Sequence, residues 1–259
     1  MERLGNHYKK TGISINALRT WGLLFLAAGI IGRGVIQNHI LGFTGLTTQQ
    51  MLEVMGSSET AMNYVTFSIA LQALETCAGP VFAVLLVQGV LHTGDFMKYF
   101  TRIFGMDILT EIPYNLCMGK GLIDFSSRNP MFSLVLGLLI MFFYQRYAGK
   151  GFKNFFVRVL VTIAALLWVS MLTIEFGTPM VVLVVVLWAS RSKGLYQSFI
   201  GASAAMACTL FSPFFLASPM SFLAIHMCNW EKADENRTVN YLSYPALLLL
   251  AFLVGKLLF

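Results

Sequence analysis

Charged residues are scarce in this sequence: they make up 12% of its 259 residues, against roughly 25% in ordinary soluble domains. Hydrophobic residues make up 57%, and the mean hydropathy is +0.71. A soluble fold of this length cannot cover so much apolar surface, because its exterior must remain polar. The scarcity of charge therefore excludes a soluble enzyme, a disordered regulator and a nucleic-acid-binding module, and it predicts a polytopic integral membrane protein.

Patterns that mark common catalytic and metal sites are also missing. The four cysteines lie far apart and no CxxC or Cys/His cluster occurs, so we expect neither a bound metal nor a disulfide framework. The cysteines are expected to be buried free thiols. There is no GxSxG elbow and no phosphate-cradling glycine loop, so short motifs alone name no reaction.

Long apolar runs fill the chain instead. Crossing ~30 Å of hydrocarbon takes about 20 helical residues, and on this criterion the sequence predicts an all-α bundle of about 8–10 transmembrane helices. A single domain, 1–259, would contain them all. The predicted spans are 19–40, 64–92, 98–118, 131–147, 155–174, 178–190, 196–211, 213–228 and 240–258. An alternative joins the seventh and eighth spans into one bent segment.

Basic residues cluster in alternate connections between these spans. Most of the 18 lysines and arginines fall in the N-terminal tail (1–18) and its border, at 94–102 and 146–158, near Arg191, and at 231–237. Cytoplasmic loops are enriched in lysine and arginine. We therefore expect a cytoplasmic N-terminus, an odd number of spans with the C-terminus outside, and residence in the plasma membrane.

Two segments carry signals for helix starts. In the outer segment 41–63, Thr47 with Gln50 three residues later is a capping-box pattern. We expect either a short helix on the membrane surface or an outer loop there. Thr178-Pro179 pairs a capping residue with proline and predicts a helix start at the span 178–190.

The predicted span 98–118 contains more polar residues than a lipid-facing helix tolerates. Asp107, Glu111 and Asn115 are four residues apart and so form one stripe along a helix. An acidic residue at a helix centre costs roughly 2.5–3.5 kcal/mol to insert, so the stripe must face protein or water. Two interpretations stay open: a polar functional cavity, or structural pairing of the carboxylates with an arginine. The candidate arginines are Arg33, Arg102 and Arg128.

The preceding span, 64–92, adds Glu75 and His92, with Gly79-Pro80 as a predicted bend. Glu75 and His92 are separated by roughly 25 Å of helix, so they cannot share one site on this helix alone. His92 lies close in sequence to Arg102 at the expected cytoplasmic end, where it is either an acid–base group or an amphipathic anchor. Glu75 is expected deeper, toward the outer half.

The chain resembles the TraX family in the segments GPVFAVLLVQGVLHT (79–93), KYFTRIFGMDILTEIPYNL (98–116) and RNPMFSLVLGLL (128–139). The later segments PMSFLAIHMCN and YLSYPALLLL fit the closing part of the family, so the resemblance covers nearly the whole chain. The matching residues are Phe82, Leu85, Leu86, Gly89, His92, Thr93, Tyr99, Arg102, Glu111, Pro113, Asn115, Asn129 and Phe132.

This resemblance implies a function. TraX proteins are similar to polytopic membrane acyltransferases and are associated with acetylation of the N-terminus of a conjugative pilin subunit. For this chain it implies transfer of an acyl group, with acetyl-CoA as the donor, to an amine or hydroxyl of a small-molecule or protein acceptor, within membrane lipid. Such a reaction needs a base for the acceptor and hydrogen-bond donors for the thioester oxyanion.

Candidate site residues follow from the stripe and the resemblance together. His92 and Glu111 are the candidate catalytic bases, and arginines suit an anionic donor. The candidate substrate-binding residues, all polar, are Glu75, Arg102, Asp107, Asn115, Arg128 and Asn129.

The chain also departs from the family pattern. Arg19 matches a basic position in the first span, but Gly29 and Ile30 replace the Asp-His pair that follows it. Leu247 replaces a histidine in the last span, and Gln88 replaces a glutamate in the second. Several alternatives stay open: the base has moved to another residue, or the chain is a non-catalytic protein that binds or moves a small molecule or lipid, or it is a membrane scaffold for a secretion or conjugation apparatus.

Overall fold

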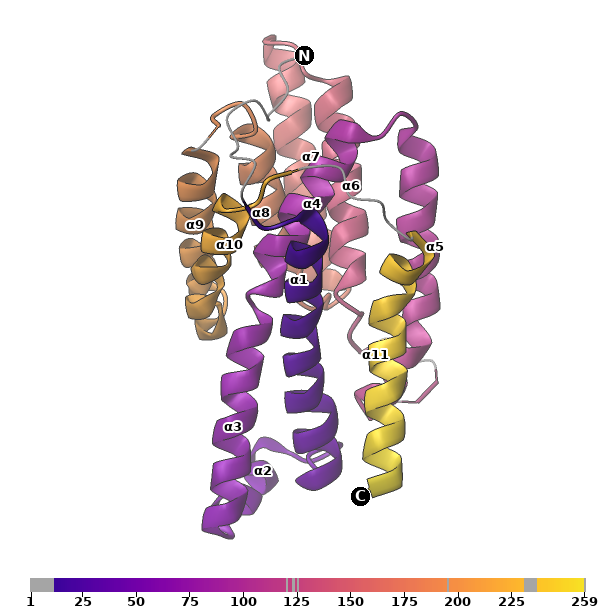
Figure 1. The fold of residues 1–259 in the computed structure, drawn as a ribbon, viewed down its shortest axis with the longest axis vertical. Coiled ribbons are helices and arrows are strands. Elements are labelled where there is room, and N and C mark those ends of the chain that lie inside the picture. The colour runs from indigo at the N-terminus through magenta and orange to yellow at the C-terminus, as the bar shows by residue number, and fades with distance from the viewer. Residues whose placement is uncertain are drawn as a thin grey trace.

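The structure is a computed structural model that describes residues 12–119, 121–122, 124, 126–194, 196–230 and 237–258. Over these residues it contains helices and no β-strand (Figure 1). The chain is thus an all-α, polytopic helical bundle, as the sequence predicts. The predicted tail up to residue 11 and the predicted basic loop up to residue 236 lie outside the described residues.

Helices follow one another through short connections, and each predicted span corresponds to one or more of them. In chain order they are α1 (Ile15–Ile30), continued by the π-helical η1 (Ile31–Ile40), α2 (Thr48–Gly56), α3 (Glu59–Glu75), α4 (Ala78–His92), α5 (Phe96–Cys117), α6 (Met131–Arg146), α7 (Phe152–Met171), α8 (Gly177–Ala189), α9 (Tyr196–Ala207), the 3₁₀ segments η2 (Cys208–Leu210) and η3 (Pro213–Met220), α10 (Ser221–His226) and α11 (Arg237–Leu258). The first helix begins inside the predicted tail. It starts at Ile15 because the side chain of Ser14 accepts a hydrogen bond from the backbone N–H of Ala17 (3.2 Å).

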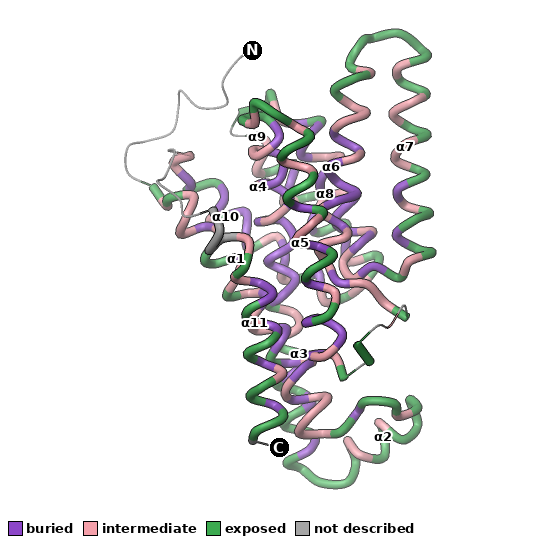
Figure 2. Tube along the Cα trace, turned by 90° about the vertical axis from the view of Figure 1, so that its right-hand side faces the viewer, coloured by how far each residue is buried: buried purple, intermediate pink, exposed green. Residues whose placement is uncertain are grey.

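Length and composition support membrane-spanning helices. Within the described ranges, Ile15–Ile40, Glu59–His92 and Phe152–Met171 are each long and apolar enough to cross a membrane, and the other apolar helices are shorter. Most of α7 is exposed or half-buried (Figure 2). Its exposed side chains are large and apolar, including Phe152, Trp168 and Met171, which suits contact with lipid. The chain is therefore an integral membrane protein.

The helices α3 and α4 form one long rod with a break. The sequence predicts the bend at Gly79-Pro80, whereas the structure interrupts the helix earlier, at Thr76 and Cys77. Proline has no N–H, so Pro80 leaves the carbonyl of Thr76 without its usual donor. The N–H of Gly79 donates to that carbonyl instead (3.3 Å). The proline thus interrupts the helix about one turn before its own position.

Two of the buried apolar clusters organise the bundle around its interior. One joins α4, α6 and α8 through side chains such as Leu86 and Leu183. The other joins α1, α5 and α11 through side chains such as Leu26 and Leu248. Residues of both clusters line the cavity described below.

The basic connections share one end of the molecule. The connections after α4, α6 and α8 lie at one end, whereas α2 and the end of α11 lie at the other (Figure 1). The predicted helix in the outer segment is confirmed: α2 begins with a capping box between Thr47 and Gln50, and its residues are exposed or half-buried. Its place on a membrane surface stays a prediction.

Candidate functional site

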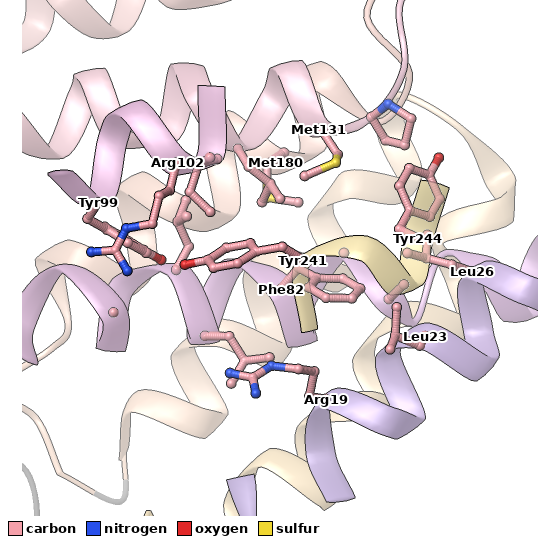
Figure 3. Close-up of a pocket in the computed structure, with 18 of the residues that line it drawn as sticks. Arg19, Leu23, Leu26, Phe82, Tyr99, Arg102, Met131, Met180, Tyr241 and Tyr244 are labelled. Carbon is pink, nitrogen blue, oxygen red and sulfur yellow. The ribbon is translucent and has the colours of Figure 1, made fainter. Parts of the chain in front are cut away.

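A cavity of about 540 Å³ lies between α1, α4, α5, α6, α8 and α11 (Figure 3). Polar side chains line the end next to the connection between α4 and α5, and mainly apolar side chains line the rest. A concave, largely apolar space with a few polar groups is typical of small-molecule sites. We call the polar end the mouth; it is formed by Arg19, His92, Asp95, Tyr99, Arg102 and Tyr241.

His92 is the last residue of α4 and has an exposed side chain. Its Nδ1 lies 2.8 Å from the carbonyl oxygen of Gln88. A carbonyl can only accept a hydrogen bond, so this contact requires a proton on Nδ1, and whenever the ring is neutral Nε2 is its basic nitrogen. The helix thus holds the tautomer in which Nε2 can take a proton from a ligand.

Asp95 caps the helix on the other side of the mouth. Its carboxylate accepts a hydrogen bond from the backbone N–H of Lys98 (3.1 Å) and pairs with the ammonium of Lys98 (3.2 Å). These interactions with Lys98 hold the pKa of Asp95 below its usual range. The ionised carboxylate therefore fixes the start of α5, the helix that carries Tyr99 and Arg102.

Tyr99 reaches across the mouth to α4. A Cβ at position 89 would overlap the Tyr99 hydroxyl, so Gly89 permits an approach that no other residue allows. The hydroxyls of Tyr99 and Tyr241 point toward one another (Figure 3), and Arg19 and Arg102 line the same end of the cavity. The mouth thus combines hydroxyl donors with positive charge.

Away from the mouth the cavity lining is mainly apolar and includes Phe176. It also includes Met131 and Met180. Phe176 precedes α8 with a φ of 54°, in the left-handed region that residues other than glycine rarely adopt. Its ring packs edge-on against Phe215, with centroids 5.7 Å apart, and the guanidinium of Arg33 lies 5.9 Å from its centroid. Packing on two sides stabilises this uncommon backbone conformation.

An ion-pair network lies beside Phe176, outside the cavity. Nη2 of Arg33 lies 2.6 Å from both carboxylate oxygens of Glu75, and Nη1 of Arg33 pairs with Glu175. Glu75 is buried, with 3% of its surface exposed. Its carboxylate is engaged by Arg33, and Glu75 does not line the cavity. Its position toward the outer half of the membrane stays a prediction.

The polar stripe of α5 faces protein, as its spacing predicts. Nη1 of Arg128 lies 3.0 Å from Oε1 of Glu111, and Nδ2 of Asn129 donates a hydrogen bond to Oε2 of Glu111 (2.7 Å). Asp107 and Asn115 are fully buried. The interpretation of structural pairing with an arginine therefore holds for Glu111.

These positions separate the predicted site residues. His92 and Arg102 line the cavity, whereas the second candidate base, Glu111, and the deep Glu75 do not. The other predicted residues, none of which lines the cavity, are Asp107, Asn115, Arg128 and Asn129. The two candidate bases thus belong to different parts of the bundle.

The sequence did not single out the tyrosines of α11. Tyr241 and Tyr244 both line the cavity and are three residues apart, which puts them on one face of the helix. Two tyrosines at helical spacing beside a run of leucines are a signal that could have indicated a polar lining. Tyr99 is among the residues that match the family pattern.

Comparisons with known proteins agree with the sequence resemblance. No curated protein and no solved structure matches the chain. The family model described as "TraX protein" matches residues 35–255, which include the cavity walls contributed by α4, α5, α6, α8 and α11. Because this match covers most of the sequence, the chain belongs to the TraX family.

Proposed function

We propose that this TraX-family membrane protein transfers an acyl group from acetyl-CoA to an amine or hydroxyl acceptor at the cavity. The observation that carries the proposal is the mouth, which combines the basic Nε2 of His92 with Arg19 and Arg102 at the entrance to an apolar interior. Acyl transfer from such a donor calls for a base, cations for the donor phosphates and a space that excludes water.

The polar and the apolar parts of the cavity lining suit different parts of acetyl-CoA. Arg102 and Arg19 at the mouth, with Lys98 one turn before Arg102, supply positive charge for phosphate groups. The apolar interior, from Leu85 to Met131, suits the pantetheine arm and a short acyl group. The donor supplies an activated acyl carbon, and the side chains supply orientation and proton transfer.

His92 is the proposed base. Nε2 takes a proton from the acceptor as the acceptor nitrogen or oxygen bonds to the thioester carbon. The carbon–sulfur bond then breaks, the acyl group remains on the acceptor, and His92 returns the proton to the leaving thiolate. The hydrogen bond from Nδ1–H to the carbonyl of Gln88 orients the ring in both steps. The proposal gives Glu111 no acid–base role, because its carboxylate is paired with Arg128 away from the cavity.

Turnover by the purified protein in lipid nanodiscs tests the proposal. Acetyl-CoA and a panel of amine and hydroxyl acceptors should give free CoA and acylated acceptor in equal amounts. His92→Gln should lower kcat by roughly 10²–10⁴. Tyr144→Phe is the control, because the hydroxyl of Tyr144 pairs with Thr162 outside the cavity (2.7 Å) and its loss should leave the rate unchanged. Absence of acylated acceptor with the wild type, or full turnover in His92→Gln, overturns the proposal.

We also propose that the mouth opens to the cytoplasm and that the protein resides in the plasma membrane with its N-terminus inside. The basic connections after α4, α6 and α8 lie at one end of the molecule, and this supports the proposed orientation (Figure 1). Reporter fusions at Gly149, between α6 and α7, and after Phe259 should fall on opposite sides of the membrane. The same side for both would contradict an odd number of spans.

A second candidate function is binding or movement of a small molecule or lipid without chemistry. It is favoured by the positions where the chain departs from the family pattern. Ile30 is 2% exposed within the cluster of α1, α5 and α11, and Leu247 packs against the same cluster, so neither offers an acid–base group. Saturable donor binding that persists in His92→Gln, with no acylated product from the wild type, would establish this alternative.

A further inference from the structure

We infer that the hydroxyl of Tyr99 binds the thioester carbonyl oxygen and stabilises the negative charge that develops there as the acceptor adds. The inference rests on the proposed acyl transfer and adds a catalytic residue to it. During acyl addition the carbonyl oxygen becomes an oxyanion, and a donor already in place for it contributes about 10²–10³ in kcat. A phenol O–H provides one such donor.

The fit between α4 and α5 holds this hydroxyl in place. Tyr99 lines the cavity and packs against the cluster that joins α4, α6 and α8. Its hydroxyl rests against Gly89, in the space that any larger residue would fill. A donor fixed by packing needs no reorganisation when the charge develops, which is the requirement for oxyanion stabilisation.

Cations and a second hydroxyl lie at the same end of the cavity as Tyr99. Arg19 and Arg102 line the mouth together with Tyr99, and the hydroxyl of Tyr241 points toward that of Tyr99 (Figure 3). Among the described lining residues the acidic side chain is that of Asp95, and its charge is paired with Lys98 (3.2 Å). Negative charge on a ligand is therefore met by donors and cations.

The Tyr99 hydroxyl lies against a position of α4 that is close to His92. Gly89, against which the hydroxyl rests, and His92 are three residues apart, so their side-chain positions share one helix face at about 5–6 Å. A carbonyl group between them can direct its oxygen to Tyr99 while the acceptor, approaching the carbon, gives its proton to His92. The two residues thus act on one reacting carbon from different sides.

Kinetics and binding with two donors test the inference. The variants are Tyr99→Phe, Gly89→Ala, which displaces the hydroxyl without removing it, and the control Tyr144→Phe. The donors are acetyl-CoA and S-ethyl-CoA, a thioether in which a methylene replaces the carbonyl. Tyr99→Phe should lower kcat by about 10²–10³ with a much smaller change in donor KM. Its affinity for S-ethyl-CoA should equal that of the wild type, and Gly89→Ala should lower kcat in the same direction.

The possible outcomes separate this inference from the proposed function. Wild-type turnover that is undiminished in Tyr99→Phe overturns the role of Tyr99 and leaves acyl transfer standing. Equal loss of affinity for both donors in Tyr99→Phe also overturns it, because that result indicates packing rather than contact with the carbonyl. A folded wild type that neither binds CoA nor turns over overturns both.

Discussion

The carboxylate of Glu75 lies directly against the backbone of Gly29, in the space that a Cβ at that position would occupy. From there both of its oxygens reach Nη2 of Arg33 at 2.6 Å. A buried charge is tolerated only when it is paired and hydrogen-bonded. The glycine of α1 and the arginine of η1 therefore jointly hold the carboxylate at the end of α3.

Gly29→Ala should destabilise the protein strongly. The added methyl would push the Glu75 carboxylate away from Arg33, and breaking a buried ion pair costs about 3–5 kcal/mol. Thermal unfolding in detergent measures the change. Gly105→Ala is the matched control, because no described atom lies within 4 Å of a Cβ there and alanine favours helix. A Gly29→Ala protein that melts with the wild type would show that Glu75 does not need this space.

Glu111 should matter for stability rather than for catalysis. Its carboxylate pairs with Arg128 (3.0 Å) and accepts a hydrogen bond from Asn129 (2.7 Å). Glu111→Ala and Arg128→Ala should each destabilise by about 3 kcal/mol, and the double variant by less than the sum. A double-mutant cycle of unfolding free energies measures this, together with kcat of each folded variant. Loss of turnover in a stable Glu111→Gln protein would restore Glu111 as a base.

Asp95 should make the stability of the folded protein depend on pH in the acid range. The pKa of its carboxyl is lower in the folded protein than in the unfolded chain, chiefly through the backbone N–H and side chain of Lys98. Its stabilising effect is therefore complete above the unfolded value of about 3.9 and is lost as the pH falls through the folded value. Asp95→Asn keeps a helix cap that does not titrate. As the pH is lowered from about 7 to about 3, the melting temperature of the wild type should fall more steeply than that of Asp95→Asn. An equal fall for both proteins would contradict this role.

Helices were predictable because they depend on local sequence. Each long apolar run forms one or more helical segments, and Thr47 with Gln50 marked the start of α2 correctly. At α8 the predicted start is one residue late, because Thr178-Pro179 indicated the start and the helix begins at Gly177. The preceding residue, Phe176, has a left-handed backbone held by packing against distant side chains, and local sequence carries no sign of those contacts.

The candidate site was predictable only in part, because the cavity depends on which helices meet. The spacing of the α5 stripe indicated a face turned toward protein or water, since helix periodicity sets that face, and Asp107 and Asn115 are buried in protein. The sequence left Arg128 as one of three candidate partners for Glu111, and it could not indicate that His92 lines a cavity with Tyr241. Tyr241 belongs to the last helix, and its place beside α4 and α5 follows from tertiary packing alone.

Arg102 should contribute to donor binding at the mouth. A hydrogen bond to a charged group contributes about 1.5–3 kcal/mol, so Arg102→Gln should raise the Kd for CoA roughly tenfold to a hundredfold. Exposed charges are screened by salt, so the variant should also show a weaker dependence of Kd between about 50 mM and 500 mM NaCl. Isothermal titration in nanodiscs measures both effects.

Arg191 provides the matched control for this experiment. It lies at the same end of the molecule but outside the cavity, with its guanidinium 4.5 Å from the ring centroid of Trp188 and donating to the Trp188 carbonyl (2.6 Å). Arg191→Gln should therefore leave Kd unchanged. If Arg102→Gln and Arg191→Gln weaken binding equally, the attraction comes from the overall positive field of this end. Such a result would contradict binding at the mouth, because a ligand bound there would contact Arg102 but not Arg191.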